Sequence, residues 1–199
     1  MSVLEITLFV IIILIGLSIG LSIVWSTLTL GISPMPSSKQ ARQAMLMLLD
    51  ETLITASAAT PKKKEAGPIY ELGSGWGGLL ISLAKKYPQR NIIAYELSIM
   101  PWLITIIRVK VLGLKNVTVY RQDFLNADLT DSAVILCYLF PRGMNALEAK
   151  IKLSTENARP EYLISHNFSL LSHKAIKTIQ LNDLYKSPVY LYRLNLPAQ

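Results

Sequence analysis

This sequence of 199 residues contains little cysteine, little histidine and, over one long stretch, no charge. Because Cys137 is the single cysteine, an internal disulfide and a cysteine-rich metal site are both excluded. The two histidines, His166 and His173, lie seven positions apart, which matches no familiar zinc spacing, so we expect no metal cofactor. Hydrophobic residues make up 51% of the chain, which excludes a disordered protein.

The uncharged stretch predicts a membrane anchor at the N-terminus, residues 1–32. Ile6 to Leu30 comprises 25 uncharged residues, which as a helix would span about 38 Å, more than the ~30 Å hydrocarbon core. Trp25 near its end is typical of a membrane–water interface. A cleaved secretory signal is the alternative, but the start MSVLE lacks basic residues and the apolar run exceeds the roughly 7–15 residues of such signals.

The charges that follow the anchor predict its orientation. Lys39 and Arg42 come soon after the apolar run, and no Lys or Arg precedes it. By the positive-inside rule, the rest of the chain lies on the cytoplasmic side of a bacterial inner membrane, or on the matrix side of a mitochondrial one. The net charge is +7, and the basic residues behind it are scattered along the chain. Their one consecutive run, Lys62–Lys64, is either a solvated loop or a contact for anionic lipid. We expect no nucleic-acid partner, and the oligomeric state is open.

Beyond the anchor, we expect a linker and an N-terminal helix over residues 33–66 and one domain over 67–199. Ser37 or Ser38 is placed to cap that helix, whose apolar positions include Ala41, Ala44, Met45, Leu48 and Leu49. Strands and helices then alternate, which predicts an α/β fold with a parallel, doubly wound sheet and a closing hairpin. The expected strands are 68–72, 91–97, 116–121, 133–140, 161–168, 174–181 and 189–194, and the expected helices are 79–86, 101–112 and 143–158.

A glycine-rich turn follows the first expected strand. Gly73, Gly75, Gly77 and Gly78 fall within six residues, where glycine lets the backbone turn tightly and approach a ligand. A generic turn explains one or two glycines, not four. The G-x-G-x-x-G match by itself is a weak signal of dinucleotide binding.

Three acidic residues strengthen this signal, because each stands at the carboxyl end of a successive strand, where open α/β sheets bind ligands. They are Glu71, Glu96 and Asp123. Singly, each is an ordinary cap or turn residue. Jointly, they suit one ligand that carries a cationic amine, a ribose diol and an adenine amino group. A pyrophosphate would be repelled by Glu71, which argues against NAD.

At this point the sequence resembles the class I S-adenosylmethionine-dependent methyltransferases. Their acid-x-Gly-x-Gly-x-Gly motif matches ELGSGWG, Glu71 to Gly77, and the resemblance covers about residues 67–194. It implies a Rossmann-like sheet of seven strands and S-adenosylmethionine as the cofactor. The residues that it assigns to cofactor binding are Glu71, Gly73, Ser74, Gly75, Trp76, Gly77, Glu96, Leu97, Asp123 and Phe124.

A narrower resemblance is to the membrane-anchored protein-lysine methyltransferases of the ATP synthase c-subunit and adenine nucleotide translocase type, with their prokaryotic relatives. It rests on the anchor, the Pro-rich linker, and the segments Tyr95–Ser98, Pro101–Leu103 and Tyr138–Pro141. Trp76 departs from the pattern, since such turns commonly have a small or acidic residue there; it either covers the cofactor or narrows the pocket. The Asn/Asp-Pro-Pro-aromatic tetrad of many amide and nucleobase methyltransferases is missing.

The resemblance implies methyl transfer to a lysine of a membrane-associated protein, with an acceptor pocket of Tyr138, Phe140 and Pro141. Tyr138 and Phe140 are equally well explained as core residues. We expect His166 to be a satisfied core or surface histidine rather than a proton acceptor, and Cys137 to be buried rather than nucleophilic.

Three other functions remain open at this stage. The acceptor is alternatively a lipid amine or a quinone, or the chain is a non-catalytic, nucleotide-binding membrane module. A dehydrogenase of Rossmann type would instead bind NAD(H) and not S-adenosylmethionine.

Overall fold

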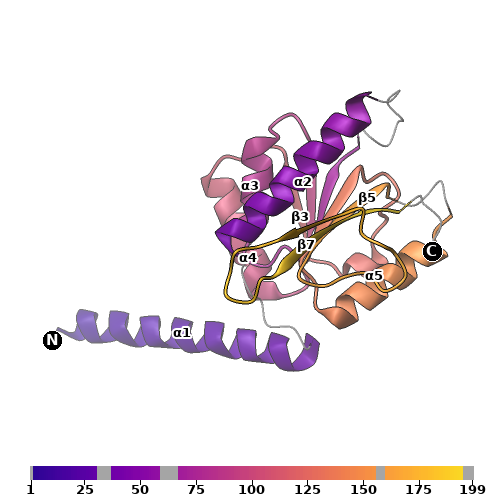
Figure 1. The fold of residues 1–199 in the computed structure, drawn as a ribbon. Helices are drawn as coiled ribbons and strands as arrows, with labels where there is room; N and C mark the ends of the chain where they lie inside the picture. Colours follow the sequence, from indigo (N-terminus) through magenta and orange to yellow (C-terminus); the bar gives the residue numbers. More distant parts are fainter. Residues whose placement is uncertain (1, 31–36, 59–66, 156–159, 195–199) are drawn as a thin grey trace.

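The computed structural model describes residues 2–30, 37–58, 67–155 and 160–194 (Figure 1). The linker residues 33–36 and the run Lys62–Lys64 lie outside the described residues, as does the side chain of Trp25. The helix that was expected to run to residue 158 ends at Leu153, with Ser154 as its C-cap. The first helix, α1 (Val3–Leu30), extends away from the rest of the chain. Its segment Val3–Leu21, with a mean hydropathy of 2.6 and no part buried, is long and apolar enough to cross a membrane, a property shared with signal sequences.

The remaining elements form one seven-stranded sheet with helices on both faces. The strands are β1 (Ile69–Leu72), β2 (Ile92–Tyr95), β3 (Val117–Tyr120), β4 (Val134–Cys137), β5 (Tyr162–His166), β6 (Lys177–Gln180) and β7 (Pro188–Arg193). Their order is β3-β2-β1-β4-β5-β7-β6. The first five are parallel, and β7 is antiparallel to both β5 and β6. This is the Rossmann-like sheet of seven strands with a closing hairpin that the sequence predicted, so the predicted fold is confirmed.

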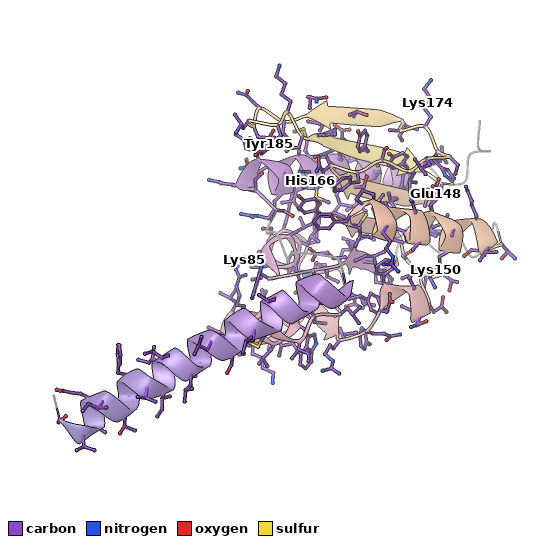
Figure 2. All side chains as sticks on the ribbon, turned by 90° about the horizontal axis from the view of Figure 1, so that it is seen from below. Lys85, Glu148, Lys150, His166, Lys174 and Tyr185 are labelled. Carbon is purple, nitrogen blue, oxygen red and sulfur yellow. The ribbon has the colours of Figure 1, made fainter. Side chains whose placement is uncertain are left out.

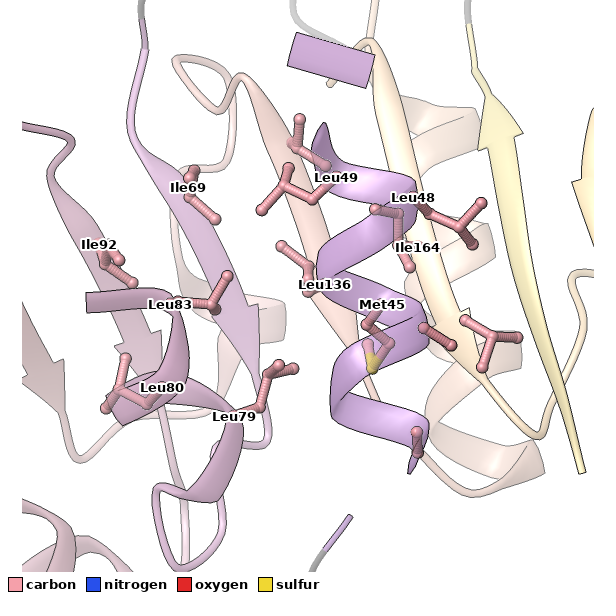
Figure 3. Packing of buried hydrophobic residues seen from close by; sticks show 14 of the residues in the cluster. Met45, Leu48, Leu49, Ile69, Leu79, Leu80, Leu83, Ile92, Leu136 and Ile164 are labelled. Atoms are coloured by element: carbon pink, nitrogen blue, oxygen red, sulfur yellow. The ribbon is translucent and has the colours of Figure 1, made fainter. Parts of the chain in front are cut away.

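The core lies in two layers because every central strand is covered on both sides. On one face pack α2 (Lys39–Ala58) and α3 (Gly78–Lys86); on the other packs α5 (Pro141–Leu153). Figure 3 shows Met45, Leu48 and Leu49 of α2 lying over Ile69, Leu136 and Ile164 of the sheet. The fourth helix, α4 (Ile99–Val111), follows β2 and contributes Val109 to the same layer.

Helix α2 is an integral part of this core. All five apolar positions expected of it are buried, and the backbone N–H of Ala41 donates to Ser38 Oγ at 3.0 Å, which confirms the cap. The division of the chain at residue 67 therefore separates a helix from the sheet against which it packs.

Two strand boundaries were wrong by three residues. Strand β6 begins at Lys177, whereas the sequence predicted a start at residue 174. The fourth strand was expected to run to Phe140, but β4 ends at Cys137, and α5 begins at Pro141 rather than Gly143. Pro141 occupies the first turn of α5. A backbone N–H at that position has no partner within the helix, so proline costs no hydrogen bond there, and its fixed φ suits the start of a helix. The chain therefore leaves the sheet over residues 138–140, and Tyr138 and Phe140 lie beyond the strand.

Candidate active site

The glycine-rich turn joins β1 to α3 at the carboxyl edge of the sheet. Gly73, Gly75 and Gly77 all have positive φ. Gly77 precedes α3 with φ 72°, and a Cβ there would lie 2.8 Å from Cγ2 of Thr105 in α4. Thr105 Oγ1 also donates to the carbonyl of Gly75 at 2.9 Å. Helix α4 therefore holds the turn in place, and only glycine fits against it at position 77.

Glu71 is a buried carboxyl group without a full set of partners. It lies on β1, 5% exposed, and its Oε2 has no hydrogen-bond partner. Burial, and secondarily the charge of Glu96, raise the pKa of Glu71 well above its ordinary value. An unpaired buried carboxyl is costly to the fold on its own, which makes it a candidate for binding a cation.

Glu96 follows β2 and reaches back to the glycine-rich turn. Its Oε2 accepts a hydrogen bond from the backbone N–H of Gly75 at 2.8 Å, and its Oε1 accepts one from Ser98 at 2.7 Å. One carboxylate therefore joins the turn to the start of α4. Each oxygen retains a lone pair, so the carboxylate can still accept from a ligand hydroxyl.

Asp123 stands farther along the same edge, after β3. Its Oδ1 accepts from the backbone N–H of Leu125 at 2.9 Å and caps the short 3₁₀ helix η1 (Phe124–Asn126). Phe124 is half-buried and Leu97, beside Glu96, is 44% exposed. The structure thus places the three acidic residues at the ends of β1, β2 and β3, as expected, with Asp123 engaged in a local cap. That they hold one adenosyl ligand stays a prediction.

A cavity of about 340 Å³ opens on the α2 side of the glycine-rich turn. Glu71 and Ser74 face it from the sheet edge, and Oγ of Ser74 is a second buried atom without a partner. Trp76 also lines this cavity. The complete lining is Ser37, Arg42, Glu71, Gly73, Ser74, Gly75, Trp76, Gly78, Leu79, Ile81, Ser82, Arg108 and Tyr138.

Arg42, like Arg108, is a lining residue that sequence reasoning missed. It comes from the first turns of α2, and its Nη1 donates to the carbonyl of Ser37. Within the part of the chain that the structure describes, no ion pair joins Arg42 to a carboxylate. A cavity that holds an unpaired carboxyl and a guanidinium offers both halves of a site for a zwitterionic amino-acid group. S-Adenosylmethionine carries such a group, so the residues present fit the cofactor.

Aromatic rings continue from the cavity along the ends of β4 and β5. Cys137 and Ser165 are the last residues paired between these strands, and Tyr138 and His166 come next. Their rings lie 4.4 Å apart between centroids, and Phe140 and Phe168 follow at 5.8 Å. Of the predicted acceptor pocket, Tyr138 lines the cavity, whereas Phe140 packs against Phe168 and is not among the lining residues, and Pro141 starts α5.

His166 differs from its expected state. It is buried at the end of β5 (labelled in Figure 2), but neither ring nitrogen has a hydrogen-bond partner, so it is not a satisfied histidine. Burial lowers the pKa of His166, against a weaker opposing effect of Asp183, which favours the neutral imidazole. Cys137 is fully buried, as predicted, and burial raises the pKa of its thiol to about 12.

Comparisons with known proteins identify the family and the fold of the chain. The family model of the ANTKMT methyltransferase domain matches residues 71–177, just over half of the 199. No curated protein sequence matches the chain.

Three solved structures share the fold. An RNA methyltransferase from Salinibacter ruber in complex with S-adenosyl-L-homocysteine has a TM-score of 0.65 at 21% identity, over 83% of this chain and 98% of that one. A SAM-dependent methyltransferase from Aquifex aeolicus has a TM-score of 0.52 at 15% identity, over 75% of this chain and 88% of that one. The magnesium protoporphyrin IX methyltransferase from Synechocystis, with bound SAM, has a TM-score of 0.54 at 14% identity, over 76% of this chain and 78% of that one. Together with the family match and the strand order, they show that the chain belongs to the ANTKMT methyltransferase domain family of class I S-adenosylmethionine-dependent methyltransferases.

Proposed function

We propose that this methyltransferase acts on a lysine side chain of a membrane-associated protein. The observation that supports this acceptor most directly is the aromatic group beyond β4 and β5. Tyr138 lines the cavity together with Glu71 and Ser74 and lies against His166, and a second aromatic pair, Phe140 and Phe168, follows these two residues in the sequence. Such a surface suits an alkyl chain that ends in a nitrogen nucleophile.

The apolar surroundings serve the chemistry because lysine must be neutral to react. When bound, S-adenosylmethionine supplies a methyl group on a cationic sulfur. With an ordinary pKa near 10.4, holding a lysine amine neutral at pH 7 costs about 4–5 kcal/mol. Burial among aromatic rings disfavours the ammonium and reduces that cost. The neutral ring of His166, 4.4 Å from that of Tyr138 between centroids, adds to these apolar surroundings.

Helix α1 supports a membrane-associated acceptor. It is apolar along Val3–Leu21, and two basic residues, Lys39 and Arg42, follow it closely in the sequence. As a retained anchor, it would raise the effective concentration of acceptors in the same bilayer relative to soluble ones. The positive-inside rule puts the domain on the cytoplasmic side, or on the matrix side in a mitochondrion.

Transfer of labelled methyl groups tests the acceptor. The full chain is incubated with its native membranes and with S-adenosylmethionine labelled in the methyl group, and protein and extracted lipid are counted separately. We expect label in protein, on lysine by mass spectrometry, and none with the Glu71→Gln variant. Label in the lipid fraction would instead identify a lipid or quinone acceptor, and cofactor binding without any label would identify a non-catalytic module.

A further inference from the structure

Helix α4 has two faces with different roles. Its buried face supports the active site: Thr105 packs on Gly77 and bonds to Gly75, and Val109 enters the core. In addition, Nη1 of Arg108 donates to the carbonyl of Trp76. A partner that binds the opposite face of α4 would therefore be separated from the glycine-rich turn only by the width of this helix.

The opposite face is an exposed apolar stripe. Its residues recur every four positions, which places them on one side of the helix, and each is between 40% and 80% exposed. They are Ile99, Leu103, Ile107 and Val111. A contiguous apolar surface of this kind is costly in water and marks a contact with a partner or a membrane.

Positive charge surrounds this stripe. From Leu97 to Gln122 the sequence has no acidic residue and four basic ones: Arg108, Lys110, Lys115 and Arg121. Trp102 lies at the flank of α4, with the guanidinium carbon of Arg121 6.0 Å from the centre of its ring. An apolar stripe bordered by cations and a tryptophan is the composition of a helix that lies in a lipid headgroup region.

The stripe is also continuous with the proposed anchor. Helices α1 and α4 contact each other, and Met100 lines a shallow apolar hollow together with Ile11, Leu14 and Ile15 of α1. The start of α4 therefore lies beside the apolar helix proposed as the anchor.

We propose that this α4 face, defined as Ile99, Leu103, Ile107 and Val111 with the basic residues around them, docks on the anionic surface of the bilayer in which α1 is anchored. The proposal rests on the proposed anchoring by α1. Docking through α4 would hold the glycine-rich turn and its cavity against the headgroups. The acceptor is then a lysine close to the membrane surface rather than one on a distant soluble domain.

Single cysteines in the full chain test the contact directly. Cys137 is the only native cysteine and is fully buried, so an introduced cysteine is labelled selectively with an environment-sensitive fluorophore. The test variant is Leu103→Cys, and the matched control is Leu153→Cys, an exposed leucine on α5. Ile12→Cys in α1 reports on the anchor itself. Each protein is reconstituted into vesicles of phosphatidylcholine with or without phosphatidylglycerol, containing spin-labelled lipid as a quencher.

We expect the probe at position 103 to be quenched by the spin-labelled lipid, more strongly with phosphatidylglycerol, while the probe at 153 is not. Since each basic residue near an anionic surface adds about 1 kcal/mol, Lys110→Gln with Lys115→Gln should weaken the docking roughly thirtyfold and remove the effect of phosphatidylglycerol. Quenching at position 12 without quenching at 103 would overturn the docking and leave the anchor intact. A blue-shifted but unquenched probe at 103 would also overturn it, because α1 or another protein then covers the face. No quenching at position 12 would overturn the anchor.

Discussion

At the scale of single residues, the site combines groups that the sequence signals with others that it does not. Glu71 and Glu96 could be predicted because acids that end parallel strands must meet at one edge of the sheet. Arg42 could not be, because it reaches the cavity only when α2 folds back over β5 and β7, far from it in the sequence. The unpaired state of His166 was equally inaccessible, since it depends on the packing around the end of β5.

Arg42 is expected to bind the carboxylate of the cofactor. Arg42→Ala should weaken the binding of S-adenosylhomocysteine roughly ten- to a hundredfold, the value of a charge-assisted hydrogen-bonded pair. Binding of 5′-methylthioadenosine, which lacks the amino-acid group, should not change. Calorimetric titration of both ligands separates the two effects, with Lys39→Ala, an exposed residue of the same helix, as the control. An equal loss for both ligands would mean that Arg42 supports the fold and not the carboxylate.

Glu71 is expected to release a proton when the cofactor binds. Burial raises the pKa of Glu71 in the free protein, whereas an ammonium group beside it would favour the carboxylate and lower that pKa. At a pH between these two values, binding releases a proton, which appears as a dependence of the calorimetric enthalpy on the ionisation enthalpy of the buffer. Glu71→Gln should abolish this dependence and weaken binding about tenfold. Glu51→Gln, whose carboxylate pairs with Lys177 away from the cavity, should retain it.

The same raised pKa fixes the sign of a stability effect. A carboxyl group that holds its proton more tightly in the folded state destabilises the fold as the pH rises from the unfolded-state pKa to the folded-state one. The Glu71→Gln protein should therefore gain stability relative to the wild type as the pH increases through that interval. If the stability of the Glu71→Gln protein relative to the wild type instead increased toward acid pH, burial would not be the cause of the raised pKa of Glu71.

At the scale of elements, the strands and helices were predictable where apolar periodicity was strong. The buried stripe of α2 and the strand–helix alternation from β1 to α5 follow directly from the order of residues. The end of β4 was not predictable, because AVILCYLF is uniformly apolar and gives no sign of where the chain leaves the sheet. Pro141 was the available signal, since proline favours the first turn of a helix.

The role of α2 in the core makes a prediction about stability. Leu48 is fully buried between α2 and the sheet, and its neighbour Met47 is 50% exposed. Leu48→Ala should lower the free energy of unfolding by about 2–5 kcal/mol, the range for large buried residues, and Met47→Ala by no more than about 0.5 kcal/mol. Urea unfolding of the full chain in detergent, followed by near-UV circular dichroism, measures both. Similar losses would mean that α2 is not packed as described.

At the scale of the whole molecule, the chain consists of an apolar helix and a domain that begins with α2. Deleting residues 1–36 removes α1 but leaves Ser38, the cap of α2, and Arg42 in place. This protein should fold without detergent and bind S-adenosylhomocysteine as the full chain does. Deleting residues 1–66 also removes Met45, Leu48 and Leu49 from the core and Arg42 from the cavity, and it should not yield a folded protein.

The two deletions together locate the boundary that the sequence placed at residue 67. Circular dichroism, gel filtration and calorimetric titration distinguish the possible results. If the protein that lacks residues 1–66 folds and binds S-adenosylhomocysteine with unchanged affinity, α2 belongs with the anchor and Arg42 is not part of the cofactor site. If the protein that lacks residues 1–36 fails to fold, α1 is needed for the fold itself. The contact between α1 and α4 would then be an interface that stabilises the domain.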